Sequence, residues 1–254
     1  MSVILISGTI GAGKSSLTDM LAKEIDSKPF YESVEDNEVL PLFYSNPEQY
    51  AFLLQIFFLN KRFLAMKKAL VNDYNVLDRS IYEDSLLFHL NDDLGRVTDI
   101  EVQQYDHLLD TMLNELDDVA PKKRPDLMVH IKVSLDTMLE RIKKRGRTYE
   151  QLESDETLYG YYESLNQRYD QWYEDFDVCP KIQIDGDRFD FVEKPEHAQE
   201  VIKQIQQKEN LSSENAALSY IISQHKELQH SIADSIVATL DEKFSKTFTR
   251  IRLG

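Results

Sequence analysis

Nine residues near the start of the chain have types and spacing suited to holding a chain of phosphates. They are Gly8, Thr9, Ile10, Gly11, Ala12, Gly13, Lys14, Ser15 and Ser16. This G-x-x-x-x-G-K-S pattern follows the apolar run 3–6 and precedes a helical pattern over 14–26, which is the strand–loop–helix context that it requires. Glycines let consecutive N–H groups turn toward one anion, Lys14 reaches the β- and γ-phosphates, and the Ser15 hydroxyl can ligate Mg²⁺. The sequence therefore predicts binding of a nucleoside triphosphate.

Two other predicted strands end in side chains that can take part in phosphoryl transfer. Glu32 closes a strand expected over 29–32, and Asp78 and Arg79 stand at the end of another over 74–78. Because ligands bind outside the carboxyl ends of parallel strands, we expect these groups near the phosphate loop. Glu32 could accept a hydroxyl proton, and Asp78 could hold Mg²⁺ or act as the base. These residues alone also fit a solvated acid and a structural ion pair.

The composition around Glu32 bears on the identity of the phosphoryl acceptor. Residues 29–60 contain several carboxylates but no lysine or arginine. An acceptor that already carries a phosphate would need cationic partners in a buried site. The segment therefore favours a neutral hydroxyl compound as the acceptor.

Basic residues gather at one predicted helix end in an otherwise acidic chain. They are Arg141, Lys143, Lys144, Arg145 and Arg147, with Gly146 among them. Cations at a helix C-terminus can simply face the helix dipole or solvent. We interpret this cluster instead as a lid whose side chains stabilise charge on the transferred phosphoryl group.

Apolar stretches that alternate with helical patterns predict a three-layer α/β/α fold with a five-stranded parallel sheet. We expect strands over 3–7, 29–32, 74–78, 127–133 and 181–185, and helices over 14–26, 47–71, 80–91, 99–118, 134–144, 155–174 and 195–208. The helix over 47–71 has an apolar stripe at helical spacing. Its members are Tyr50, Leu53, Leu54, Phe57, Phe58 and Leu64.

The chain changes character near residue 210. Residues 211–254 hold equal numbers of acidic and basic side chains, so the formal net charge of −16 falls on residues 1–210. We expect a main domain over 1–210 and an amphipathic helical extension over 211–254 that packs on this domain or on a partner. The apolar positions of the extension are Leu218, Ile222, His225, Leu228, Ile232, Ile236, Leu240 and Phe244. A membrane-surface helix is the weaker alternative, because the polar face is not strongly basic.

Composition narrows the class of protein further. The acidic balance argues against nucleic-acid polymers as partners, because neutralising their phosphates needs clustered lysine and arginine. No apolar run approaches the roughly 20 residues that span a bilayer, and the start of the chain has the pattern of a first strand rather than of a signal peptide. The single cysteine, Cys179, excludes an internal disulfide and favours a cytoplasmic setting.

Together these motifs resemble those of the deoxynucleoside kinase family, and most closely the bacterial deoxyadenosine and deoxyguanosine kinases. The resemblance covers residues 1–208 and rests on five stretches: Gly8 to Ser15, Phe30-Tyr31-Glu32-Ser33-Val34, Tyr44 through Gln55 to Arg62, Asp78-Arg79-Ser80-Ile81-Tyr82-Glu83-Asp84, and Arg145-Gly146-Arg147-Thr148-Tyr149-Glu150. It implies a P-loop kinase fold, ATP as donor, Mg²⁺ as cofactor and a homodimer. The implied reaction is phosphorylation of the 5′-hydroxyl of a purine deoxynucleoside in nucleotide salvage, and the sequence does not choose between deoxyadenosine and deoxyguanosine.

The resemblance also implies roles for the residues around the reacting groups. Glu32 resembles the carboxylate that takes the 5′-hydroxyl proton, and Arg79 would lie beside it. Asp78 resembles the acid at the Mg²⁺ site, which is sometimes itself described as the proton acceptor. Tyr44 and Glu150 resemble the pair that binds the sugar 3′-hydroxyl, and a tyrosine against the sugar would leave little room for a 2′-hydroxyl.

The remaining roles concern the two bases and the lid. Gln55 and Asp84 resemble groups that hydrogen-bond the edge of the acceptor base, with Arg62 nearby and Phe88 against the ring. Lid residues by resemblance are Arg141, Arg145 and Arg147, and Ile184-Asp185-Gly186-Asp187 resembles the loop near the donor's adenine. One departure is the pair Asp36-Asn37, which stands where the animal enzymes carry a basic residue and a tryptophan.

Two other functions fit part of the pattern. A nucleoside monophosphate kinase of the thymidylate kinase type has a similar Asp-Arg motif, but the segment 29–60 lacks the cations that its acceptor needs. A nucleotide-dependent switch that binds guanine would need Asn-Lys-x-Asp, whereas Asn60-Lys61 continues with Arg-Phe. Asp92-Asp93-Leu94-Gly95 is like a switch motif but follows a predicted helix rather than a strand.

Overall fold

The computed structural model describes residues 3–32, 37–71, 75–119, 124–153, 155, 157–210 and 212. The chain forms two compact units, Met1–Gln207 and Lys208–Gly254. The architecture below is that of the first unit. The amphipathic extension predicted over 211–254 lies outside the described residues apart from 212, and so do Ser33 and Val34 of the stretch that contains Glu32.

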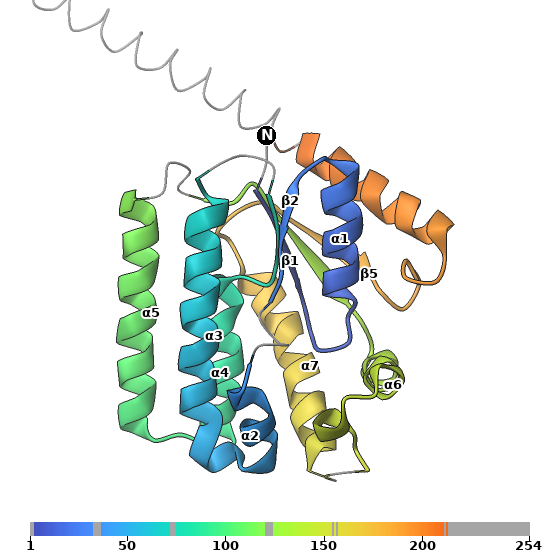
Figure 1. The fold of residues 1–254 in the computed structure, drawn as a ribbon. Helices are drawn as coiled ribbons and strands as arrows, with labels where there is room; N and C mark the ends of the chain where they lie inside the picture. Colours follow the sequence, from blue (N-terminus) through green and yellow to red (C-terminus); the bar gives the residue numbers. More distant parts are fainter. Residues whose placement is uncertain are drawn as a thin grey trace, which may run out of the picture. The chain divides into compact units, whose positions relative to one another are not determined.

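A five-stranded parallel sheet forms the centre of the first unit, as predicted (Figure 1). Its strands are β1 (Val3–Gly8), β2 (Lys28–Phe30), β3 (Asn75–Asp78), β4 (Leu127–Lys132) and β5 (Lys181–Asp185), in the order β2-β3-β1-β4-β5. Ile6 of β1 is opposite Asp78 of β3, and Gly8 is opposite Ile131 of β4. The carboxyl ends of β1, β2 and β3 therefore lie at one edge, where ligands bind in open α/β sheets.

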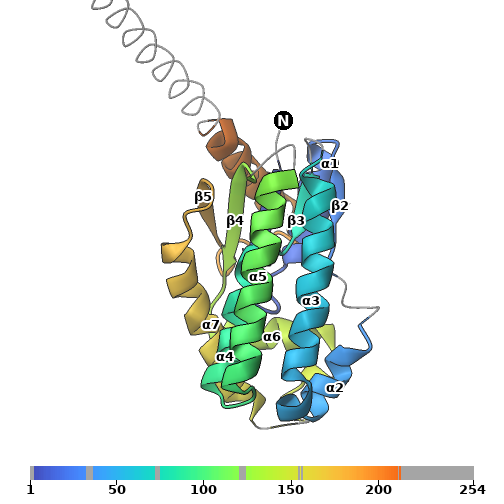
Figure 2. The same cartoon turned by 90° about the vertical axis from the view of Figure 1, so that its left-hand side faces the viewer.

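Helices cover both faces of this sheet (Figures 1 and 2). They are α1 (Lys14–Glu24), α2 (Val39–Ser45), α3 (Pro47–Ala69), α4 (Asp84–Asp93), α5 (Asp99–Val119), α6 (Leu135–Arg145) and α7 (Leu158–Asp175), with 3₁₀ turns η1 (Ile81–Glu83) and η2 (Thr148–Glu150). Residues 195–210 are also helical. Figure 2 shows α3 and α5 side by side in front of the sheet. None of the described helices is long and apolar enough to span a bilayer.

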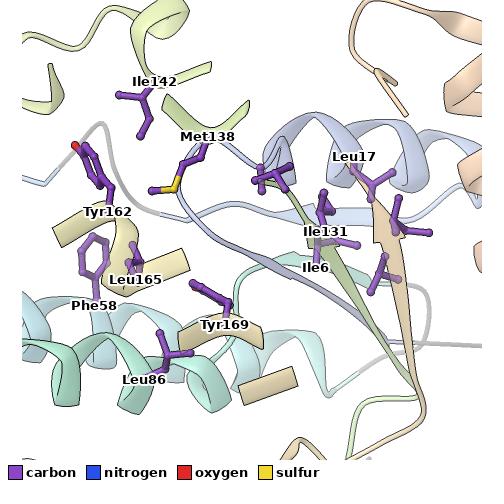
Figure 3. Close-up of a cluster of buried hydrophobic side chains, with 14 of the residues drawn as sticks. Ile6, Leu17, Phe58, Leu86, Ile131, Met138, Ile142, Tyr162, Leu165 and Tyr169 are labelled. Carbon is purple, nitrogen blue, oxygen red and sulfur yellow. The ribbon is translucent and has the colours of Figure 1, made fainter. Parts of the chain in front are cut away.

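The side chains of β1 explain the two layers, because successive residues of a strand face opposite sides. Ile4 and Ile6 pack with Leu17 of α1, whereas Val3 and Leu5 pack with Leu59 of α3. Such strands are buried on both faces and have a continuous apolar sequence. Figure 3 shows the first of these clusters, in which Ile6, Leu17 and Ile131 lie together by the sheet and Phe58, Tyr162 and Leu165 lie together among the helices.

The predicted and observed elements differ in two places that matter for the site. The sequence predicted no helix over 39–45, where the structure has α2. The apolar stripe predicted for α3 is wrong in part, because Leu53 and Leu64 are 50% and 46% exposed. The buried side of α3 instead includes polar residues of the site, Gln55 and Arg62. These two polar side chains can be buried because both hydrogen-bond to Asp84.

Candidate active site

The glycines of the phosphate loop stand where larger residues cannot. Gly8 has φ +144°, and a Cβ there would lie 2.6 Å from the carbonyl oxygen of Ile131. Gly13 has φ +96°, and a Cβ would lie 3.1 Å from the ring of Phe191. Gly13 is also the residue before α1, so the N–H groups that begin this helix point into the loop. Together with the helix dipole, they make an anion site.

Lys14 is buried at the head of α1 and belongs to the same site. Its ammonium donates to the carbonyl oxygen of Thr9 over 2.8 Å. Burial, reinforced by the charge of Arg79, lowers the pKa of Lys14 from 10.5 to about 8, although Asp78 and Glu32 oppose this. A bound polyphosphate would restore the charged form.

Ser15 and Asp78 lie together at the side of the loop. The Ser15 hydroxyl donates to Oδ2 of Asp78. The other oxygen of this carboxylate, Oδ1, is buried and has no hydrogen-bond partner in the described part of the chain. Burial raises the pKa of Asp78. A hydroxyl beside a carboxylate with a free oxygen fits Mg²⁺, which takes one or two protein oxygens and completes its shell with water and phosphate.

Glu32 follows β2 and points toward the same edge of the sheet. Its Oε2 accepts from Nε of Arg79 over 3.0 Å, and its Oε1 accepts from Nη2 of Arg62 over 2.5 Å. Burial opposes ionisation, but the charges of Arg79, Arg62 and Lys14 outweigh it and lower the pKa of Glu32 to about 2. The carboxylate is therefore ionised at neutral pH. Only 14% of its side chain is exposed.

Arg62 of α3 joins Glu32 to a second buried carboxylate. Its Nη1 donates to Oδ1 of Asp84, and the hydroxyl of Tyr105 donates to Oδ2 of Asp84 over 2.7 Å. Gln55 donates to the backbone oxygen of Asp84 over 3.1 Å. The predicted base-reading residues are thus bonded to one another, with Arg62 and Gln55 facing the cavity and Asp84 behind them.

Arg141 ties the phosphate loop to the loop that follows β5. Nη1 donates to the carbonyl oxygen of Ala12 over 3.1 Å, and Nη2 donates to that of Gly186 over 2.7 Å. Nearby, the exposed pair Lys144 and Glu193 are 2.5 Å apart. The donor end of the site therefore lies between α6 and residues 186–193.

Two predicted lid residues share one buried acid. Arg145 donates to Oε2 of Glu150, and Arg147 donates to Oε1 over 3.4 Å. Glu150 is 3% exposed. Tyr44 of α2 is near it, with its ring 5.2 Å from that of Tyr149. Burial and the neighbouring tyrosines raise the pKa of Tyr44 well above 10, and the charge of Glu150 adds to this.

Most of these groups border one cavity of about 990 Å³. On the side of the phosphate loop it is lined by Ile10, Gly11, Gly13, Lys14, Ser15, Ser16, Asp78, Arg141, Arg145 and Arg147. On the other side it is lined by Glu32, Leu40, Phe43, Tyr44, Leu54, Gln55, Phe58, Arg62, Arg79, Asn91, Glu150 and Tyr161. Residues predicted for a donor and for an acceptor therefore share one space, large enough for two small ligands.

Six predicted site residues do not line this cavity: Gly8, Thr9 and Ala12 of the phosphate loop, and Asp84, Phe88 and Asp185. Phe88 is fully buried, with its ring 4.2 Å from that of Tyr105. Asp84 is also fully buried, so a contact with a base would have to pass through Arg62. Asp185 accepts from the backbone N–H groups of Asp187 and Arg188, so it shapes the turn.

Sequence reasoning missed part of the wall opposite the phosphate loop. Leu40 and Phe43 of α2, Asn91 of α4 and Tyr161 of α7 line the cavity. One signal for α2 was available, because the side chain of Asn37 accepts from the backbone N–H groups of residues 39 and 40 as a helix cap does. Nothing in the sequence separates Tyr161 from the core tyrosines of the same helix.

The parallel sheet with a glycine-rich loop between β1 and α1 defines a P-loop nucleotide-binding protein. The family model described as deoxynucleoside kinase matches residues 4–210. The chain belongs to the deoxynucleoside kinase family, and it is therefore a kinase that binds a nucleoside and a nucleotide.

Individual relatives agree with this assignment. The chain is 60% identical over 205 residues to the deoxyguanosine kinase of Lactobacillus johnsonii, covering 81% of this chain and 91% of the relative. It is 46% identical over 208 residues to the deoxyadenosine kinase of Lactobacillus acidophilus, covering 82% and 96%. A solved structure of the deoxyadenosine kinase from M. mycoides with bound dATP has a TM-score of 0.67 and 28% identity, and it covers 83% of this chain and 100% of that one.

Proposed function

We propose that this kinase transfers the γ-phosphoryl group of ATP to the 5′-hydroxyl of a purine deoxynucleoside. The observation that carries this proposal is the placement of Glu32. It lines the cavity that Lys14 and Ser15 also line, and it is held by Arg79. A carboxylate and a guanidinium across from a triphosphate cradle can activate an alcohol and stabilise the charge of the transferred group.

On the donor side, the amides of the phosphate loop and Lys14 bind the β- and γ-phosphates. Ser15 and Asp78 would hold Mg²⁺, which when bound would neutralise developing charge on the phosphates. Arg141, Arg145 and Arg147 border the same end of the cavity. Closure of these arginines on the phosphates would require Arg145 and Arg147 to leave Glu150.

On the acceptor side, Glu32 accepts the proton of the 5′-hydroxyl, and Arg79 orients the Glu32 carboxylate. A group with a pKa of about 2 is a weak base, so its main effect is to orient the hydroxyl and to receive the proton late. A loose phosphoryl-transfer transition state requires little prior deprotonation of the nucleophile. The contact of Asp78 with Ser15 supports a metal role for Asp78 and leaves the proton to Glu32.

The remaining acceptor contacts are assigned by position around the cavity. Tyr44 and Glu150 bind the sugar 3′-hydroxyl, and Gln55 and Arg62 bind the edge of the base. Phe58 and Tyr161 lie on this side of the cavity and offer ring surfaces to the base. Phe88 and Asp84 then support these groups rather than touch the nucleoside.

Among purines we propose deoxyguanosine as the preferred acceptor. Two Lactobacillus relatives named deoxyguanosine kinase are 60% and 58% identical to this chain, whereas the relative named deoxyadenosine kinase is 46% identical. The test is ADP release with deoxyguanosine, deoxyadenosine, deoxycytidine and thymidine at matched concentrations. Turnover is expected to be fastest with deoxyguanosine. Turnover with none of the four, beside active controls, would refute the proposal.

The same assay addresses the nucleoside monophosphate kinase alternative. Thymidine 5′-monophosphate is added as a fifth acceptor. Turnover with it and not with the nucleosides would restore that alternative. The family assignment and the cation-free segment 29–60 both favour the nucleoside.

We also propose a homodimer, a kinase domain over about 1–210 and a cytoplasmic location, where ATP is available. The family match over 4–210 supports the domain boundary. Leu53 and Leu64 of α3 are half-exposed on one side of the helix, and Ile100 of α5 is 72% exposed. Such apolar side chains fit a contact between two copies. Light scattering of the wild type and of Leu64→Glu tests this, with a dimer expected only for the wild type.

A further inference from the structure

Arg79 has a second set of partners on the side away from Glu32. Its Nη1 donates to the hydroxyl of Tyr169 and lies 3.6 Å from Oε2 of Glu83. Its backbone has φ +69°, in the left-handed region that few residues other than glycine adopt. Such conformations persist where the surroundings fix them, and they gather at functional sites. The surroundings of Arg79 therefore hold its backbone in this conformation.

Glu83 connects three parts of the fold through one buried carboxylate. Oε2 accepts from the Ser7 hydroxyl over 2.9 Å and from the Tyr169 hydroxyl over 3.1 Å. Oε1 accepts from the backbone N–H of Ser80 over 3.3 Å. Glu83 is fully buried, and such an acid requires a cation nearby, which Arg79 supplies. The end of β1, the turn after β3 and helix α7 are thereby joined behind Arg79.

Tyr169 is the contribution of α7 to this group. It is 2% exposed and packs near Leu86 and Leu165 (Figure 3). Its ring lies 5.7 Å from that of His130 in a stacked arrangement. Tyr169 does not line the cavity. Its hydroxyl can therefore affect a bound substrate only through a neighbour, and that neighbour is Arg79.

We propose that Tyr169, supported by Glu83, is a positioning residue that holds the guanidinium of Arg79 against the transferred phosphoryl group. The inference rests on the role proposed above for Arg79. The hydrogen bonds of Arg79 to described residues use Nε toward Glu32 and Nη1 toward Tyr169, which leaves Nη2 for the phosphoryl group. A planar guanidinium held at two of its nitrogens keeps one orientation. Preorganised donors of this kind act mainly in the transition state.

A double-mutant cycle tests the proposal. Tyr169→Phe removes only the hydroxyl, and Arg79→Lys removes the fork but keeps the charge. Tyr169→Phe is expected to lower kcat about tenfold and to leave the KM values for ATP and deoxyguanosine within about twofold, because the interaction is made in the transition state. When residue 79 is already lysine, Tyr169→Phe should alter kcat less than about twofold, because the Tyr169 hydroxyl then has no guanidinium to position.

The matched control is Tyr173→Phe, one turn further along α7. The Tyr173 ring stacks on His130 at 5.2 Å, so this variant also removes a hydroxyl beside His130, away from Arg79. Its kcat should equal that of the wild type. Glu83→Gln is a second probe of the same link and should likewise lower kcat in the wild type and not in Arg79→Lys. Urea unfolding checks that each variant is folded at the assay temperature.

The outcomes separate this inference from the role of Arg79 itself. If Arg79→Lys keeps wild-type turnover, the proposed function of Arg79 fails. If Arg79→Lys loses turnover but Tyr169→Phe does not, only the positioning role fails. Equal losses from Tyr169→Phe in both backgrounds would also overturn it, since the hydroxyl would then act independently of Arg79.

Discussion

Nε of Arg79 donates to Oε2 of Glu32 over 3.0 Å, which joins the residue after β3 to the carboxylate after β2. The two strands are neighbours in the sheet, with Phe30 opposite Leu77. Parallel pairing therefore brings a base and a cation from distant parts of the sequence to one point. They line the same cavity as the phosphate loop.

Lys14 should make nucleotide binding depend on pH. Burial lowers the pKa of Lys14 to about 8, so the free protein loses this charge as the pH rises through 8. ATP binds the charged form, and its apparent Kd should weaken about fivefold between pH 8 and pH 9. Lys14→Arg keeps the charge and should show no such change. Calorimetric titration with ATP between pH 6.5 and 9.5 measures this, and an identical profile for both proteins would contradict the assignment.

Asp78→Asn should weaken Mg²⁺ binding without unfolding the protein. The amide keeps the size of the carboxylate but loses its charge, so half-maximal activity should need about tenfold more Mg²⁺. Burial raises the pKa of Asp78, so its ionisation costs folded-state stability; this cost grows as the pH rises from 3.8 to the raised pKa and is complete above it. At neutral pH the variant should therefore melt at the same or a higher temperature. Asp110→Asn, on the exposed side of α5, is the control. An unchanged Mg²⁺ requirement would contradict the metal role.

Glu150→Gln tests the sugar site. If Glu150 binds the 3′-hydroxyl, the variant should lose about tenfold in kcat/KM with deoxyguanosine and little with 2′,3′-dideoxyguanosine, which has no such hydroxyl. The KM for ATP should stay the same or fall, because Arg145 and Arg147 no longer have to leave an ion pair with Glu150 to reach the phosphates. Steady-state kinetics with both acceptors distinguishes these effects. Equal losses with the two acceptors would show that Glu150 does not read the 3′ position.

Arg96 should stabilise the residues that line the acceptor side of the cavity. Its guanidinium lies 5.0 Å from the ring centre of Tyr161 and 5.9 Å from that of Phe43, and it donates to Asn91 over 3.2 Å. Arg96→Met should raise the KM for deoxyguanosine about three- to tenfold and leave that for ATP unchanged.

A matched control for Arg96 is available on α3. Lys67 lies 5.3 Å from the ring centre of Phe63, away from the cavity. Lys67→Met removes a cation–ring contact of the same kind and should leave both KM values as in the wild type. An equal change in the two variants would point to a general loss of stability rather than to the wall.

The fold was predictable because its signals are local. Each strand lies within two residues of its predicted bounds, and the phosphate loop has a fixed spacing. Helix α2 was not predicted because seven residues with Pro41 in the first turn show no period. The predicted apolar stripe of α3 is wrong in part because this helix is apolar on several sides. The spacing of its apolar residues alone could not reveal that Gln55 and Arg62 are buried.

The site was predictable only in part, for a related reason. Glu32, Asp78 and Arg79 stand at strand ends, so parallel pairing alone brings them together. Phe88 and Tyr161 are both aromatic residues on helices, and only tertiary packing decides that Tyr161 lines the cavity while Phe88 packs on Tyr105. Glu83 also binds Ser7 and Tyr169, which come from two distant segments that no local pattern could join to it.

The turnover of Glu32→Gln with ATP and deoxyguanosine tests whether Glu32 takes the proton of the 5′-hydroxyl. The amide keeps the size of the side chain but cannot take the proton, so kcat should fall about 10²-fold or more, the usual contribution of a general base. Glu24→Gln, exposed at the end of α1, should match the wild type. Turnover of Glu32→Gln equal to that of the wild type would show that Glu32 does not take this proton.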